Sequence, residues 1–143
     1  MRGEELAQEI RKEHEALTAL MRRLQAEVIA PRHSWTSLAE DLHIFLNHLR
    51  RHFELEEEGG FMEDVLWRWP QAASQVDALR AEHKRLLQEA ERLVHRSDQV
   101  TNRPPARAWA EACHRLLSAI REHERKENRL IQELFYLDVG GGD

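Results

Sequence analysis

The chain contains 143 residues, of which 41% are hydrophobic and 33% are charged, and its formal net charge is −5. We expect one all-α domain over residues 1–143, because six glycines and a single tyrosine give an all-β fold little support. The net negative charge argues against a nucleic-acid-binding surface, and the apolar runs are too short to span a membrane.

The first helix is expected at about residues 4–30, where apolar residues recur at helical spacing. Pro31 should end it, because proline lacks an amide hydrogen and restricts the residue before it. A second helix should begin near residues 34–37, since Ser37 and Glu40 have the spacing of a capping box. The predicted inward residues are Leu6, Ile10, His14, Leu17, Met21, Leu24 and Val28 in the first helix, and Leu38, Leu42, Phe45, Leu49, His52 and Glu56 in the second.

The pair Gly59-Gly60 interrupts the pattern of the second helix. Each glycine would cost roughly 1 kcal/mol in a helix interior. We therefore expect a kinked continuation of the second helix through Phe61 to the turn at Trp69-Pro70, or else a short separate helix in this segment.

A third helix is predicted at about residues 71–96, followed by a polar loop at 97–103. Pro104 and Pro105 suit the first turn of a fourth helix, which the glycines at 140–142 should end. Four long helices with short turns predict an up-down-up-down antiparallel four-helix bundle. The predicted inward residues are Val76, Leu79, His83, Leu86 or Leu87, Ala90 and Leu93 in the third helix, and Trp109, Cys113, Leu116, Ile120, His123, Glu127, Leu130 and Leu134 in the fourth.

The spacing of the inward histidines places them at one height in this bundle. The candidates in chain order are His14, the pair His52 and Glu56, His83, and the pair His123 and Glu127, with each pair counted at its centre. The midpoints between consecutive candidates fall at Ser34, between Arg68 and Trp69, and at Pro104, and all four prolines are at or near these points. Two residues equally far from a turn return to the same height, because each helix rises about 1.5 Å per residue. One level is therefore predicted to hold His14, the pair His52 and Glu56, His83, and the pair His123 and Glu127.

Such a level predicts a metal site. A histidine and a glutamate four residues apart share one helix face, and burying them is costly unless they are paired or bind metal. Imidazole and carboxylate ligands suit iron, manganese or zinc, and six side chains exceed the needs of one tetrahedral zinc. Two carboxylates can each bridge a pair of ions, and the four imidazoles then supply two ligands to each ion. Together with a bridging oxide or hydroxide, this arrangement leaves an open position on each metal.

The ordered set of His14, residues 52–57 (HFELEE), Glu82-His83 and residues 122–127 (EHERKE) resembles the hemerythrin-like domain, also called the HHE cation-binding domain. The resemblance covers almost the whole chain. It implies a hemerythrin-like bundle around a non-haem di-iron centre. The implied ligands are His14, His52, Glu56, His83, His123 and Glu127, with Glu56 and Glu127 as bridging carboxylates.

One position departs from the oxygen-carrying hemerythrins, which have a further histidine one turn before the third-helix histidine. This chain has Leu79 there, so the asymmetric centre of those carriers is in doubt. His48, one turn before His52, is a candidate fifth imidazole, although such a residue is more often partly solvated. Glu57 can also approach the site, but its neighbour Glu58 suggests an ordinary acidic surface run.

Two Glu-x-x-His pairs of the kind used by ferritin-like bundles also occur, Glu40 with His43 and Glu111 with His114. His43 and His114 lie nine residues from His52 and His123, which turns them about 180° away at ~100° per residue. We expect both, and His95, to be solvated surface residues. Cys113 is expected to be a small core residue, and a lone cysteine together with the charged N-terminus fits a cytoplasmic protein.

Two functions remain open from the sequence. The first is a cytoplasmic di-iron protein that binds or reacts with dioxygen, nitric oxide or peroxide in a pocket lined by Leu17, Leu49, Leu79 and Ile120. Its role would be sensing, storage, detoxification or repair, and its redox partner is unknown. The second is a regulatory or interaction bundle with a mainly structural metal, whose partner surface is formed by Phe61, Trp67 and Trp69. A domain without metal is a weaker third possibility.

Overall fold

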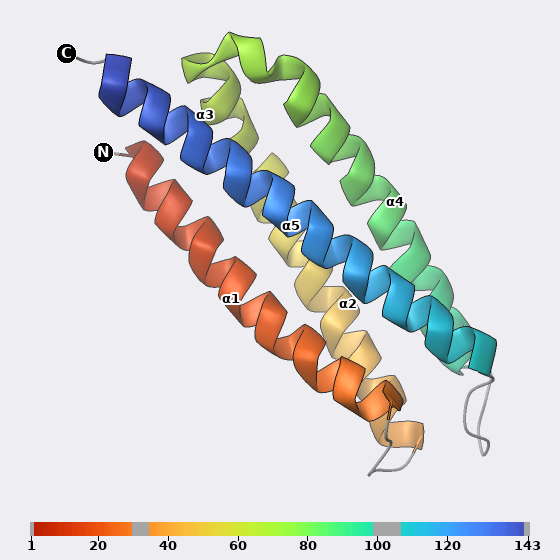
Figure 1. The fold of residues 1–143 in the computed structure, drawn as a ribbon. Helices are drawn as coiled ribbons and strands as arrows, with labels where there is room; N and C mark the ends of the chain where they lie inside the picture. Colours follow the sequence, from red (N-terminus) through yellow and green to blue (C-terminus); the bar gives the residue numbers. More distant parts are fainter. Residues whose placement is uncertain (1, 30–34, 99–106, 142–143) are drawn as a thin grey trace.

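The structure is a computed structural model that describes residues 2–29, 35–98 and 107–141, with side chains described at residues 5, 8–28, 38–98 and 107–133. Four long helices run alternately up and down, and both ends of the chain lie at the same end of the molecule (Figure 1). They are α1 (Arg2–Ile29), α2 (Trp35–Glu57), α4 (Ala73–Asp98) and α5 (Arg107–Gly141). Both α1 and α4 pack against α2 and α5. The predicted all-α antiparallel bundle is confirmed.

The inward faces of the four helices agree with the predicted apolar stripes. Except for Val28 and Leu87, which are half-buried, the predicted inward residues with described side chains are buried. They form two apolar clusters, one of which includes Leu17, Leu49 and Ile120, and the other Ile10, Leu79 and Leu130. The helices are amphipathic, and their association is driven by removing these faces from water.

The segment after Gly59-Gly60 is a separate helix, so the kinked continuation is wrong and its alternative is right. Helix α3 (Phe61–Arg68) begins after Gly60, whose φ of 93° lies in the left-handed region that glycine adopts without a steric penalty. A Cβ atom at Gly59 would collide with the carbonyl oxygen of Leu55. Helix α3 leads into the short 3₁₀ helix η1 (Pro70–Ala72), which joins it to α4.

The predicted loop at residues 97–103 begins too early, because Ser97 and Asp98 still belong to α4. The Ser97 hydroxyl donates to the carbonyl oxygen of Val94 at 2.6 Å, so this buried hydroxyl is hydrogen-bonded within the last turn of α4. The predicted turns at Pro31 to Ser34 and at Pro104-Pro105 lie outside the described residues, as do the side chains of Leu6, Ser37 and Leu134. Helix α5 continues through Gly140 to Gly141.

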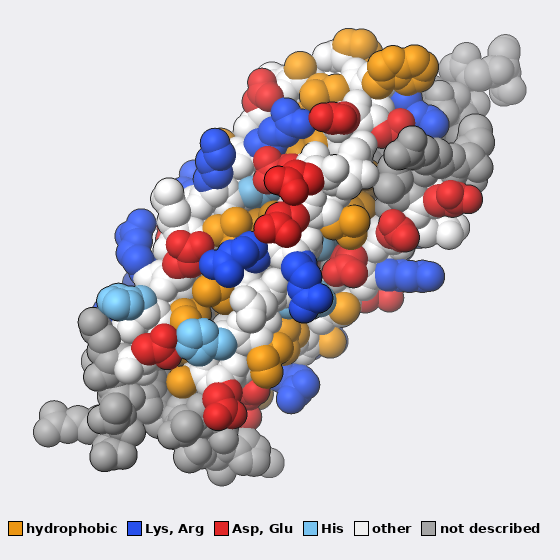
Figure 2. Space-filling model, turned by 180° about the vertical axis from the view of Figure 1, so that it is seen from behind, with side chains coloured by type: hydrophobic (Ala, Val, Ile, Leu, Met, Phe, Trp, Pro, Cys, Tyr) orange, Lys and Arg blue, Asp and Glu red, His pale blue; other side chains and the backbone are white. Residues whose placement is uncertain are grey.

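Charged side chains are spread over the face of the molecule seen in Figure 2, among smaller hydrophobic areas. Figure 2 shows acidic and basic side chains interspersed over the face seen from behind, without one sign dominating it. No helix in the described part of the chain has the length and apolar character needed to cross a membrane.

Candidate metal centre

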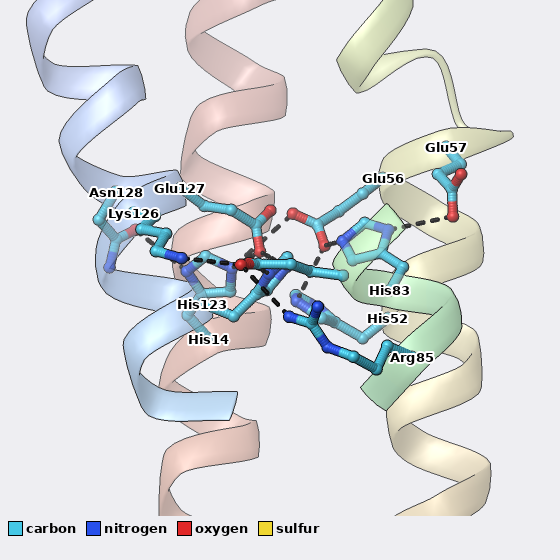
Figure 3. A network of polar contacts seen from close by, with 11 residues as sticks. His14, His52, Glu56, Glu57, His83, Arg85, His123, Lys126, Glu127 and Asn128 are labelled. Carbon is cyan, nitrogen blue, oxygen red and sulfur yellow. Dashed lines mark hydrogen bonds and ion pairs between the residues drawn. The ribbon is translucent and has the colours of Figure 1, made fainter. Parts of the chain in front are cut away.

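The structure brings the six predicted site residues together at one level between the four long helices (Figure 3). His14 comes from α1, His52 and Glu56 from α2, His83 from α4, and His123 and Glu127 from α5. His14 is 4% exposed, and the other five residues are at most 1% exposed. The two carboxylates extend toward each other across the middle of the bundle (Figure 3).

The six residues form two overlapping groups that share the glutamates. His14 and His52 belong to one group and His83 and His123 to the other, while Glu56 and Glu127 belong to both. The Oε1 atom of Glu56 lies 3.3 Å from Nε2 of His52 and 3.4 Å from Nε2 of His83. Oε1 of Glu127 lies 2.7 Å from Nε2 of His123 and 3.9 Å from Nε2 of His14. A carboxylate shared by two groups of imidazoles has the arrangement needed to bridge two cations.

The inward-facing atoms of this cluster have no hydrogen-bond partners, although they are fully buried. This holds for Nε2 of His14, His52, His83 and His123, and for both carboxylate oxygens of Glu56 and Glu127. Leaving a buried polar group unpaired costs roughly 1–3 kcal/mol, and more for a charged group. Eight such atoms directed at one small region therefore fit the donor set of a metal centre, which would satisfy all of them at once.

The outward-facing nitrogens of three of the imidazoles are held by neighbouring helices. Nδ1 of His83 donates to Oε2 of Glu57 at 3.0 Å, and Nδ1 of His123 donates to Oε1 of Glu82 at 2.7 Å. Nδ1 of His14 donates to Oδ1 of Asn128 at 3.0 Å. A carboxylate oxygen and an amide oxygen can only accept, so each of these bonds keeps the proton on Nδ1 and leaves the Nε2 lone pair directed into the centre.

The protonation of the centre favours cation binding. Burial, opposed by the charge of Glu56, lowers the pKa of His52 to about 4, and burial also lowers the pKa of His123. Burial raises the pKa of Glu56, but the neighbouring imidazoles of His14 and His83 outweigh it and hold that pKa at about 2. For His14, burial lowers the pKa, but the carboxylates of Glu56 and Glu124 more than compensate, so the pKa is raised. An ionised Glu56 beside neutral imidazoles of His52 and His123 is a donor set of the kind that metal ions bind, and a cation at His14 would displace any proton held on its Nε2.

The other residues considered from the sequence lie elsewhere. His43 and His114 are exposed and bind Asp98 and Gln25 respectively, and His95 is exposed as expected. His48 is only half-buried, and its Nε2 atom lies 3.6 Å from Oε2 of Glu13, outside both groups of candidate ligands. Cys113 is buried, and burial raises its pKa to about 12, which agrees with a core role.

Several residues around the centre were not found from the sequence. For Glu57 the sequence allowed an approach to the site but favoured an acidic surface run, and in the structure it accepts from His83. The roles of Glu82 and Asn128 were not predicted. Phe53 was also missed, and its ring stacks on that of His83 with 4.0 Å between the ring centroids. A signal was present, because Glu57, Glu82 and Asn128 each directly adjoin a candidate ligand and therefore lie near the same level.

The predicted partner surface of Phe61, Trp67 and Trp69 does not form. Trp67 is 83% exposed, but Phe61 and Trp69 are buried in the apolar cluster at that end of the bundle. Only one of the three proposed aromatic residues therefore faces solvent.

The fold and the buried cluster define a class of protein, a helical bundle with histidine and glutamate groups able to hold metal cations. The family model of the hemerythrin HHE cation-binding domain matches residues 5–135. The chain therefore belongs to the hemerythrin HHE cation-binding family, and the resemblance noted in the sequence is confirmed. Searches among curated proteins and among solved structures gave no match.

Proposed function

We propose that this chain is a non-haem di-iron protein that binds or reacts with a small molecule such as dioxygen, nitric oxide or peroxide. The observation that carries this proposal is the set of eight buried, unpartnered nitrogen and oxygen atoms that converge from four helices. Family membership supports the binding of a cation. Two overlapping donor groups support two cations in place of one.

In this proposal His14 and His52 hold one ion, His83 and His123 hold the other, and Glu56 and Glu127 bridge them. The mixed nitrogen and oxygen donors suit iron, and they also accept manganese or zinc. Iron would supply the redox chemistry and open coordination positions for the small molecule.

The protein surroundings suit a small apolar or weakly polar ligand. Leu17, Leu49 and Ile120 are fully buried in one apolar cluster, and Leu79 is buried in the other. Phe53 covers His83 by stacking on its ring. In this proposal these residues would limit the access of water to the centre, which would strengthen electrostatic interactions and limit the size of what enters.

The test is anaerobic reconstitution of the metal-free protein with ferrous iron, followed by exposure to air or nitric oxide. We expect absorption bands of an oxidised di-iron centre after air, and a distinct spectral change with nitric oxide. Glu56→Ala should abolish both responses, because it removes a bridging carboxylate, whereas Glu54→Ala, an exposed change on the same helix, should retain them. Retention of a single zinc ion with no response to either gas would instead indicate a structural metal.

A further inference from the structure

The two halves of the proposed centre differ in what supports their imidazoles. In the half formed by His83 and His123, both Nδ1 atoms donate to carboxylates, those of Glu57 and Glu82. In the other half, Nδ1 of His14 donates to the neutral amide oxygen of Asn128. Nδ1 of His52 is buried and has no hydrogen-bond partner.

A carboxylate acceptor makes an imidazole a stronger metal ligand. The negative charge stabilises the proton on Nδ1 and raises the electron density on Nε2, and it also fixes the orientation of the ring. Glu82 is well placed for this role, because Nζ of Lys126 donates to its second oxygen at 2.7 Å and holds the carboxylate in position. Loss of such a supporting partner typically lowers metal affinity 10–100-fold.

Aromatic packing is closest at His83, although the Phe53 ring also lies 5.7 Å from the His52 ring in a tilted arrangement. The Phe53 ring stacks on His83 and lies edge-on to His123 at a centroid distance of 5.5 Å. Both rings are therefore held by a hydrogen bond on one side and by an aromatic contact on another. Pre-positioned ligands lose little conformational freedom when they bind a cation, which raises affinity further.

The half formed by His14 and His52 adjoins a groove on the surface. A groove of about 480 Å³ between α1 and α5 is lined by His14, Thr18, Glu124 and Asn128, and it also carries Arg11 and Arg22. Glu124 is 6% exposed, and its Oε1 atom has no hydrogen-bond partner. Glu124 thus lines this groove together with His14 and has one buried, unpaired carboxylate oxygen.

The groove on the other side of α5 does not reach a candidate ligand. It has a volume of about 350 Å³ and lies between α4 and α5, where Leu79, Glu82 and Lys126 are among its lining residues. Of these two grooves, the one between α1 and α5 is therefore the one that reaches a candidate ligand, His14.

From these differences we infer that the two metal positions are inequivalent: the position of His83 and His123 fills first and holds its ion more tightly, and the position of His14 and His52 fills second and exchanges its ion through the groove between α1 and α5. This inference rests on the proposed two-cation centre. It assigns Glu57 and Glu82 as positioning residues of the tight position.

The experiment is an anaerobic calorimetric titration of the metal-free protein with Co²⁺, with the absorption of the bound ion followed in parallel. We expect two binding steps that differ at least 10-fold in affinity. Repulsion between two bound ions would also make the second step weaker than the first. The variants therefore distinguish this cause from the effect of the supporting carboxylates. Glu57→Gln should weaken the first step roughly 10-fold or more, whereas the exposed change Glu54→Gln should leave it unaltered.

A second variant tests the weaker position by a gain of affinity. Asn128→Asp gives His14 a carboxylate acceptor and should tighten the second step, while Gln132→Glu adds the same charge to the groove one turn away and should have a much smaller effect. If Glu57→Gln leaves the first step intact, or if Asn128→Asp fails to tighten the second, the inference is wrong. Binding of no Co²⁺ at all by the unaltered protein would overturn the proposed metal centre itself.

Discussion

The two nitrogens of each imidazole in the centre lie in different surroundings, and this difference determines which of them can bind a cation. Nε2 is directed at the middle of the bundle, where it has no hydrogen-bond partner, and for His14, His83 and His123 the Nδ1 atom is bound by a side chain of another helix. A neutral imidazole carries one proton, so binding at Nδ1 leaves the inward nitrogen free to donate its lone pair to a cation. The hydrogen bonds thus prepare three of the four rings before any ion arrives.

This arrangement predicts which histidines matter for metal content. His83→Ala or Glu127→Ala should remove most of the bound iron, because each deletes a buried donor of the cluster. His43→Ala, His95→Ala and His114→Ala should keep the full load, since these residues are exposed. Elemental analysis of each variant after the same anaerobic reconstitution makes the comparison. Equal losses from the inner and outer groups would refute the assignment.

At the residue scale, the sequence predicts the six inward donors because each occupies a position of an apolar stripe at helical spacing. The residues that accept hydrogen bonds from the imidazole Nδ1 atoms are not predicted by that reasoning. Glu57, Glu82 and Asn128 lie about 100° around their helices from a candidate ligand, where a solvent-facing side chain is expected. Their side chains reach a ring on a different helix, and that contact depends on how the helices are rotated and spaced.

Among the elements, α3 has the most distinctive role, because it closes one end of the bundle. Phe61, Met62 and Val65 are buried and pack with Ile10, Val76 and other residues of the second apolar cluster. The break at Gly60 allows the chain to leave α2 and lay this short helix across the end, and the backbone amide of Asp64 donates to the carbonyl oxygen of Gly60 at 2.9 Å. The conformation of one glycine therefore determines the path of an entire segment.

This dependence on Gly60 gives a stability prediction. Gly60→Ala should destabilise the metal-free protein by about 1–2 kcal/mol, because alanine pays that penalty in the left-handed region. The exposed change Glu58→Ala, two residues earlier, should shift stability by no more than roughly 0.5 kcal/mol. Urea denaturation measures both values. An unchanged midpoint for Gly60→Ala would mean that this residue does not hold a positive φ in solution.

At the element scale, sequence reasoning predicts the helices better than their ends. The glycine pair indicates an interruption, but the composition does not distinguish a kink from a break, which depends on whether α3 can bury its apolar face. The polar stretch from Ser97 looks like a loop, yet α4 continues through Asp98 because the bundle supports its last turn and Ser97 is buried there. Tertiary packing outweighs local propensity at both places.

For the whole molecule, the polar level separates two apolar clusters of one bundle. One cluster contains Leu17 and Ile120 and the other Ile10 and Leu130, with the six donor residues between them along the helices. Such a layer opposes folding when its charges are unpaired, because burying them without partners is costly. Bound cations would offset that cost, so metal binding and stability are linked in this fold.

The measurement that tests the central claim most directly is the number of metal ions bound per chain. Anaerobic reconstitution with excess ferrous iron, removal of the unbound metal and elemental analysis against protein concentration give this number. The account predicts two iron ions per chain, because the two groups of donors share Glu56 and Glu127. A value of one ion, or of none, would contradict it.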